Sequence, residues 1–475
     1  RLPRLFHTFL ALALFATVPL RAAPARPAAS SALPAAPASD LPADPAIHYG
    51  QLANGFRYAI RANAEPRQRA ALRLFVHAGS LEESDDQRGL AHFLEHMAFN
   101  GSTHYPVDTL VEFFQRMGMS FGGDTNASTS FDRTVYQIEL PDTRAATLAE
   151  GLQVFADFAG GLLLATDQIE KERGIILAER RTRDDVGYRT FVAELNFLLG
   201  ETRIPRRLPI GVPDVIEHAD RARFLDFYHT WYRPDRMVLV IVGDIDPPAV
   251  EKAVRATFGH LAARAPARPK PSLGEVPAYL GVRASFHAEP EAPATSVAIA
   301  SVTPYAYEAD TAANRLKYLP RDLALAMLNR RLSVLAKKEN APFSAASADV
   351  SENFDFVREA TVSLVCRPGQ WSAALAAGEQ ELRRALEHGF AADELAEAVA
   401  NFRTGLDQAV RSAPTRRSSS LADAIGNTIL DRNVFTTPAT ERDLFTPALA
   451  RVTPADCLAA LRAAEEMAVR VGESD

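Results

Sequence analysis

Two histidines and a glutamate lie within about one helical turn in the segment GLAHFLEHMAFNGS, residues 89–102. In a helix over residues 89–100, His92, Glu95 and His96 share one face. Four apolar residues form the opposite face: Leu90, Phe93, Leu94 and Met97. The two imidazoles, one turn apart, can converge on one ion, and the carboxylate between them can polarise a water.

Two surface histidines on an amphipathic helix are the plain alternative. With 11 histidines in the chain, such a pair arises by chance about 0.25 times, so the pair alone is weak evidence. The glutamate at its specified place makes the coincidence more than roughly tenfold rarer. The order H-x-x-E-H is the inverzincin signature, and imidazole with carboxylate is typical of catalytic zinc. The motif therefore predicts one zinc ion (Zn2+) per chain.

A catalytic zinc needs a third protein ligand, and the segment TDQIEKERGIILAERRTRDD, residues 166–185, offers candidates. Asp167 and Glu170 form a possible capping box that would start a helix. Glu172 and Glu179 are seven residues apart, two turns along one helical face. Because surface carboxylates are common on helices, spacing alone selects neither glutamate as the ligand.

Composition and charge set the wider class. The chain has 475 residues, of which 47% are hydrophobic and 23% charged, as in globular proteins of two or more domains. The formal net charge of -7 provides no basic field for nucleic acid. Cys366 and Cys457 could form one disulfide in an oxidising compartment or stay separate buried thiols.

The N-terminus reads as an export signal. Arg1 and Arg4 precede an apolar run over residues 5–20, which predicts a signal peptide at residues 1–22 and a periplasmic or secreted protein. A membrane anchor is the alternative, although the run is short for a spanning helix. Residues 23–46 are rich in Ala and Pro and predict a disordered tether. No stable membrane span is expected after signal removal.

A pattern of strand-like runs occurs twice. Residues 54–80 contain two such runs around a turn at Glu65 and the proline after it. Residues 282–304 repeat the pattern around Glu289, which is 224 positions after Glu65. A recurring pattern at a fixed offset indicates an internal duplication.

A second landmark repeats at nearly the same offset. The segment MVLVIVGDID, residues 237–246, resembles EMAVRVGESD, residues 466–475. Gly243 and Gly472, which align, are 229 positions apart. The matching order and spacing favour duplication over a chance likeness of two apolar strands.

The repeat defines the expected domains. We predict a catalytic zinc-binding domain at 47–265, a Pro-rich linker at 266–275 and a homologous non-catalytic domain at 276–475. Each copy begins with strands and continues with helical patterns, such as residues 371–390. The predicted fold class is α+β: two duplicated domains, each a mixed β-sheet covered by helices.

Several motifs together resemble one protein family. Besides H-F-L-E-H, they are GGDTNASTSFDRTVYQIELP (122–141), EKERGIILAE (170–179), RLPIG (207–211), FYHTWYRPDRMVLVIVGDID (227–246) and LNRRLSVLAKKENAPFSAAS (328–347). The chain resembles the pitrilysin or insulinase family of zinc metallopeptidases over about residues 47–475. It is similar to the N-terminal half of a bacterial periplasmic member. This likeness implies a metallopeptidase half-clamshell.

The resemblance also implies residue roles. His92 and His96 match the zinc histidines of the family, and Glu95 matches its catalytic base. Glu179 matches the distal glutamate ligand, and Glu172 matches a glutamate that supports the site without binding metal. Glu179 lies 83 positions after His96, slightly more than is usual in the family, which indicates a loop insertion.

The resemblance also implies a substrate-binding role for two neighbouring residues. Asn126 and Ala127 match an edge strand that holds the substrate backbone by β-augmentation. The residues by themselves favour a turn at Asn126 instead.

The second copy has no metal motif, because no histidine stands 224–229 positions after His92 or His96. Ala336 and Phe343 occupy the places where the family carries an oxyanion-gripping Arg and Tyr, and neither donates in that way. The resemblance therefore implies a second homologous half, as a C-terminal continuation or a partner chain, around peptide substrates.

The expected function is a zinc-dependent endopeptidase acting on peptides or unfolded polypeptides. Glu95 would serve as general base. A non-catalytic or partner-dependent subunit of a two-part peptidase is the alternative. An ordinary H-E-x-x-H protease is disfavoured because the chain lacks that motif.

Overall fold

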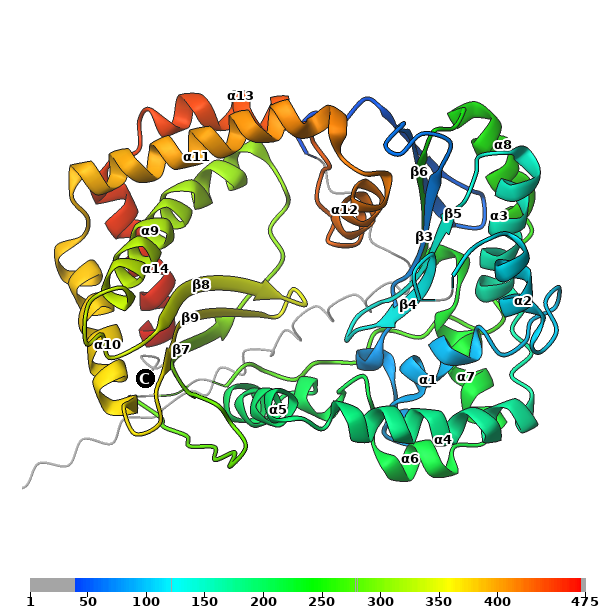
Figure 1. Cartoon of the computed structure of the whole chain (residues 1–475), viewed down its shortest axis with the longest axis horizontal. Coiled ribbons are helices and arrows are strands. Elements are labelled where there is room, and N and C mark those ends of the chain that lie inside the picture. The colour runs from blue at the N-terminus through cyan, green and yellow to red at the C-terminus, as the bar shows by residue number, and fades with distance from the viewer. Residues whose placement is uncertain (1–38, 121, 278, 280, 471–475) are drawn as a thin grey trace, which may run out of the picture.

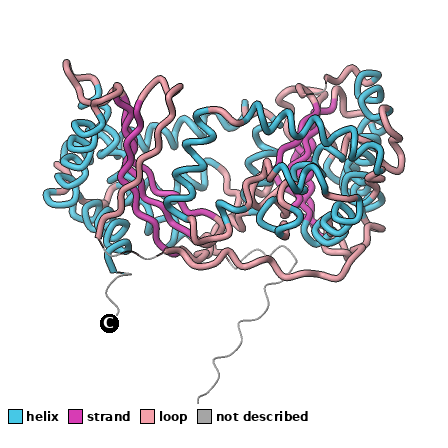
Figure 2. Tube along the Cα trace, turned by 90° about the horizontal axis from the view of Figure 1, so that it is seen from below, coloured by secondary structure: helices cyan, strands magenta, loops and turns pink. Residues whose placement is uncertain are grey.

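The computed structural model describes residues 39–470 except 121, 278 and 280. The predicted signal peptide and most of the predicted tether lie outside the described residues. Two β-sheets stand at opposite ends of the molecule, each with helices on its outer side (Figures 1 and 2). This arrangement confirms the predicted α+β class with two covered sheets.

The first sheet has six strands in the order β1-β2-β6-β3-β5-β4. Their bounds are β1 Ile47–Gln51, β2 Arg57–Ala62, β3 Ala70–Val76, β4 Thr125–Thr129, β5 Thr134–Leu140 and β6 Met237–Gly243. β2 and β6 are parallel and the other pairs antiparallel, so the sheet is mixed. The two runs predicted around Glu65 are β2 and β3, but β6 lies between them, so they form no hairpin.

The described part of this half contains eight α-helices, of which all but α5 contribute to the core of the sheet: α1 Leu90–Met97, α2 Thr109–Arg116, α3 Ala145–Gly160, α4 Thr166–Arg183, α5 Val186–Leu199, α6 Pro213–His218, α7 Arg221–Trp231 and α8 Pro247–Phe258. Every residue of β3 and β6 is buried, as expected of central strands covered on both faces. Alternate side chains, such as Leu72 and Leu239, join the core beneath these helices.

The other face of the first sheet is covered by a helix from the second half of the chain, α12 Ser418–Leu430. Its Leu421 and Ile425 pack against Phe75 of β3 and Val240 of β6 in one buried cluster. Arg73, also on β3, is 2% exposed and pairs with Asp423 of α12 at 2.6 Å. Residues from both halves of the chain therefore form one shared buried core.

The second sheet has three strands in the order β7-β9-β8, all antiparallel, so the mixed sheet predicted for this domain is wrong. Their bounds are β7 Thr295–Pro304, β8 Ala345–Asn353 and β9 Val357–Cys366. The other helices of this half are α9 Ala312–Ala336, α10 Trp371–His388, α11 Ala392–Ser412, α13 Pro438–Leu449 and α14 Pro454–Arg470. The order β7, α9, the hairpin β8-β9, α10 and α11 matches the order β3, α1, the hairpin β4-β5, α3 and α4 in the first half. This match confirms the duplication.

Two strands expected in the second copy are absent from the described residues. Residues 282–289, predicted to match β2, form no strand, and Val282 and Phe286 are 98% and 87% exposed. Residues 466–470, predicted to match β6, continue α14, and the remaining residues of that segment lie outside the described part. β2 is held by pairing with β6. No described strand offers residues 282–289 such a partner, so their short apolar pattern does not order them into a sheet.

The segments predicted as tether and linker are partly anchored. Leu41 and Asp44 are buried, and the Ser39 hydroxyl donates to the Asp310 carbonyl, so residues 39–46 pack against the second half. The linker has neither helix nor strand and is mostly exposed. Lys270 nevertheless places its Nζ 2.9 Å from Nε2 of His77 on the first domain.

Two further sequence expectations concern redox state and membranes. Cys366 and Cys457 are both buried and free, so the possible disulfide is not formed. None of the described helices is both long enough and apolar enough to cross a membrane.

Candidate metal centre and active site

Helix α1 carries the H-x-x-E-H residues and is oriented by its apolar face. Leu90, Phe93, Leu94 and Met97 are all fully buried in the first core. The predicted helix is confirmed, although it is shorter than expected at its C-terminal end and stops at Met97. His92 and Glu95 are also buried, because α4 and β4 cover the polar face.

The start of α1 depends on a distant carboxylate. Gly89 precedes the helix with φ +104°, a left-handed conformation that favours glycine, and it has no side chain to cap the helix. Glu83 supplies the cap by accepting from the backbone N–H of Gly89 at 3.0 Å and of Ala91 at 2.8 Å. Burial raises the pKa of Glu83 to about 8, although these two bonds oppose the shift. No local spacing pattern pointed to Glu83.

Helix α4 carries both candidate glutamates, but its start differs from the prediction. The helix begins at Thr166, and no side chain caps its first turn. The capping box of Asp167 and Glu170 is therefore wrong, because Asp167 already lies inside the helix. Glu170 instead accepts two bonds from Arg173.

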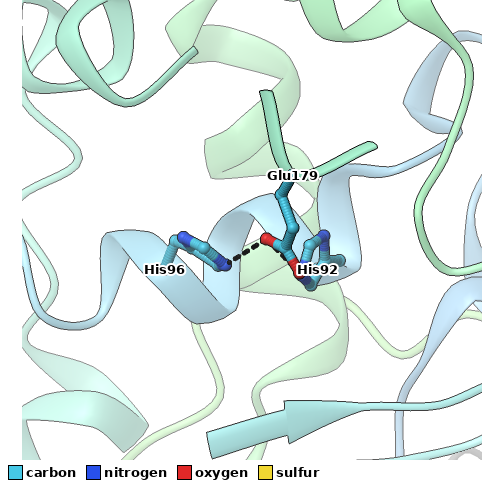
Figure 3. Close-up of side chains that lie close together, drawn as sticks. All are labelled: His92, His96 and Glu179. Atoms are coloured by element: carbon cyan, nitrogen blue, oxygen red, sulfur yellow. Dashed lines mark ion pairs between the residues drawn. The ribbon is translucent and has the colours of Figure 1, made fainter. Parts of the chain in front are cut away.

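The structure brings three predicted ligands together. Oε2 of Glu179 lies 3.3 Å from Nε2 of His96 and 3.6 Å from Nε2 of His92 (Figure 3). The ligand atoms of the three residues all lie within 4.8 Å of one another. Two donors bound to a tetrahedral zinc at roughly 2.0–2.1 Å are about 3.3–3.4 Å apart. The two separations from Glu179 are close to this value, so a donor set of two nitrogens and one carboxylate oxygen fits zinc.

Glu172 lies behind His96 and not among the ligand atoms. Its Oε1 is 2.9 Å from Nδ1 of His96, and its Oε2 accepts from Nδ2 of Asn100 at 2.8 Å. A carboxylate on Nδ1 fixes the proton there and leaves Nε2 free to bind a metal. His92 has no such support, because its buried Nδ1 has no partner among the described residues. Asn100 was missed by the sequence analysis, although it closes the same helical segment.

The charges around the ligand atoms favour a cation. His92 lowers the pKa of Glu179 to about 2, with further help from Arg183, whose guanidinium forms an ion pair with Oε1 at 2.6 Å. Burial by itself would lower the pKa of His96, but Glu172, Glu95 and Glu179 together raise it. Glu179 therefore stays ionised at neutral pH, and the imidazoles lie in a negative field.

Glu95 lies on α1 between the two histidines and is not one of the three grouped ligand residues. It is 8% exposed, and burial raises its pKa, while His92, His96 and the Thr129 hydroxyl oppose the shift. Thr129 Oγ1 donates to Glu95 Oε2 at 3.1 Å. A buried carboxylate with a raised pKa beside an ion site is suited to taking up a proton.

Asn126 and Ala127 lie in β4, so the turn that the residues alone favoured at Asn126 is wrong. β4 is the last strand of the sheet and pairs only with β5 among the described strands. No described strand covers its outer edge, where the Asn126 side chain accepts from the backbone N–H of Ala127 at 2.9 Å, and α1 packs beside it. An edge strand next to the candidate site is where an extended peptide could add to the sheet.

The second copy offers no comparable site among the described residues. Helix α9, which follows β7 as α1 follows β3, contains no histidine. Ala336 ends this helix, and Phe343 is 2% exposed. Both residues pack into the second core, so neither side chain can stabilise an oxyanion.

Comparison with known families accounts for most of the chain. The family described as Insulinase (Peptidase family M16) matches residues 58–191, which include α1, β4 and the candidate ligands. The family described as Peptidase M16 inactive domain matches residues 218–402.

Curated relatives carry protease names. The chain is 39% identical over 226 residues to the Probable zinc protease PqqL of Escherichia coli, across 48% of this chain and 24% of that protein. It is 32% identical over 306 residues to the Zinc protease PQQL-like of Arabidopsis thaliana, across 64% of this chain and 32% of that protein. The chain thus spans about a third or less of these relatives.

Solved structures extend the likeness to both domains. The first half of the periplasmic protease PqqL from Escherichia coli superposes with a TM-score of 0.84 and 28% identity, over 90% of this chain and 91% of that one. The longer PqqL structure gives a TM-score of 0.83 and 29% identity, over 90% of this chain and 47% of that one. The chain therefore belongs to the insulinase family of peptidases, family M16, and resembles one half of PqqL.

Proposed function

We propose that this chain is the metal-carrying half of a zinc-dependent endopeptidase that hydrolyses peptides or unfolded polypeptides. The observation that carries the proposal is the convergence of His92, His96 and Glu179 beside the buried Glu95. The zinc protease names of the relatives support the same reading.

Nε2 of His92, Nε2 of His96 and Oε2 of Glu179 would hold one zinc ion per chain. Zinc, when bound, lowers the pKa of a coordinated water toward about 7 and polarises the scissile carbonyl. Glu172 keeps the proton of His96 on Nδ1 through the 2.9 Å contact, so that Nε2 stays available.

Glu95 would act as the general base. Its carboxylate takes a proton from the attacking water and passes it to the leaving amine, which yields two shorter peptides. No covalent intermediate with the enzyme is needed. The outer edge of β4, at Asn126 and Ala127, would hold the substrate backbone as an added strand once the Asn126 side chain gives up the Ala127 N–H.

The chain would need a second half for full activity. Ala336 and Phe343 provide no oxyanion donor, and loss of one such donor typically costs about 10²–10³ in rate. The longer PqqL structure is about twice the length matched here. We therefore include a second homologous half, as a continuation or a partner chain, and place the protein in the periplasm or outside the cell on account of its N-terminal signal pattern.

The substitution Glu95→Gln tests the mechanism. It keeps the shape of the side chain and removes the base, so zinc content should stay the same while cleavage falls at least roughly 10²-fold. The assay follows a quenched, unstructured peptide, in whichever form cleaves it: the chain alone or the chain with its second half. Near-normal turnover by Glu95→Gln would rule out Glu95 as the base. Retained zinc with no cleavage by any unmutated form would favour the non-catalytic alternative.

A further inference from the structure

The carboxylate of Glu95 is held by one hydroxyl. Thr129 Oγ1 donates to Glu95 Oε2 at 3.1 Å and is the single hydrogen-bond donor to this carboxylate among the described residues. Glu95 is 8% exposed, so water does little to orient it. Removal of the hydroxyl would leave a buried acceptor without a partner, a costly arrangement that the side chain relieves by moving.

The donor lies on β4, the outermost described strand of the first sheet. Along β4, Thr125 is buried, Ala127 packs on the first core and Thr129 points to the same side, while Asn126 and Ser128 are exposed on the other side. The side that faces inward is the one beside α1. Thr129 is also the last residue of β4, opposite Thr134 of β5.

We infer that Thr129 is a positioning residue that couples the edge strand to the general base. This inference rests on the proposed function and adds a link between substrate binding and chemistry. A peptide that pairs with the outer edge of β4 immobilises the strand, and with it the hydroxyl that aims the Glu95 carboxylate. Binding of substrate and alignment of the base then depend on one strand. A small misalignment of a reacting group lowers the rate without weakening binding.

Three variants test the coupling. Thr129→Val has a similar shape and no hydroxyl, and Thr129→Ser keeps the hydroxyl. Thr404→Val is the matched control, because Thr404 is exposed on α11 and bonds only within its own helix. We expect Thr129→Val to lower kcat about 10-fold with KM within about 2-fold. Thr129→Ser should stay within about 3-fold of the unmutated rate, and Thr404→Val should change nothing. Zinc content should be equal in all forms.

A second measurement does not depend on turnover. In crystal structures of Thr129→Val and Thr129→Ser, the Glu95 carboxylate should leave its position in the first and keep it in the second. An unchanged carboxylate in Thr129→Val, or a rise in KM that accounts for its whole loss of activity, would overturn the inference. In the Glu95→Gln background, Thr129→Val should cause no further loss of rate. Failure of the proposed function shows in the Glu95→Gln assay, whereas failure of the coupling shows in the position of the carboxylate.

Discussion

In the first sheet β3 lies between β6 and β5, whereas β7, at the same place in the order of the second copy, pairs with β9 alone among the described strands. The long helices of the two copies nevertheless begin at a constant offset. α3 and α10 begin at Ala145 and Trp371, and α4 and α11 begin at Thr166 and Ala392; each pair differs by 226 positions. The copies thus share their helical scaffold and differ in the extent of the sheet.

The same shift compares the candidate sites. Glu172 and Glu179 correspond to Ala398 and Gly405 on α11. The two histidines correspond to Tyr318 and Asp322 of α9, and the residues next to these, Leu319 and Leu323, are buried in the second core. The scaffold therefore survives without the metal site, because apolar packing holds the helices and the site requires only a few polar side chains on them.

Helix α1 and its counterpart in the second copy, α9, also begin in different ways. α9 is capped locally, since the Thr311 side chain accepts from the backbone N–H of Asn314. α1 follows a glycine and is capped by Glu83 from a separate turn. The helix with the candidate ligands is thus fixed by the fold around it, whereas its counterpart caps itself.

The largest expected effect is the loss of zinc, which we expect only the first copy to bind. The double substitution His92→Ala/His96→Ala should reduce zinc from about one per chain to none, because two of three ligands are lost and the second copy has no replacement. The control is His388→Ala, an exposed histidine on α10. Elemental analysis after dialysis measures the zinc. Stoichiometric zinc in the double variant would contradict the assignment.

Addition of a second half should give the next largest effect. The isolated chain should bind zinc but cleave peptide slowly, because its second domain provides no oxyanion donor at Ala336 or Phe343. A second homologous half should raise the rate by about 10²–10³ without changing zinc content. Turnover of the quenched peptide with and without that half is the measurement. A fast isolated chain with no gain would show that it carries its own donors.

Substitution of two helical glycines should show where the copies meet. A Cβ at Gly426 of α12 would lie 1.9 Å from the Phe75 ring on β3, whereas one at Gly405 of α11 has no atom within 4 Å. Gly426→Ala should lower the free energy of unfolding by about 1–3 kcal/mol through overpacking. Gly405→Ala should raise it by up to about 1 kcal/mol through helix propensity. Denaturant melts compare the two, and equal effects would argue against close docking of α12.

Per pH unit, the smallest expected effect is a pH dependence of the stability that arises at the start of α1. Because burial raises the pKa of Glu83 to about 8, the folded chain holds a proton that the unfolded chain releases. This stabilisation is complete below the ordinary pKa of a glutamate and is lost as pH rises toward 8, by at most about 1.4 kcal/mol per pH unit. Glu83→Gln should remove this slope in melts with a chelator present. Parallel slopes in both proteins would disprove the shift.

Sequence alone determined the local parts of the candidate site. The faces of α1, the spacing of His92 and His96, and the pairing of Glu172 with Glu179 follow from a helical period that neighbouring residues set. The duplication was also readable, because apolar patterns repeat at a nearly constant offset. The same local reasoning failed at residues 282–289, since a strand pattern becomes a strand only if a partner edge is present.

Tertiary structure decided which distant residues meet. The cap by Glu83, the bond from Thr129 to Glu95 and the docking of α12 on β3 join positions that no local period relates. Such contacts depend on strand order and helix packing, which place segments far apart in the chain side by side. The sequences of α1 and α4 thus supply the residue types that the chemistry needs. Glu179 Oε2 lies 3.3–3.6 Å from the two histidine nitrogens only because both helices pack on one core.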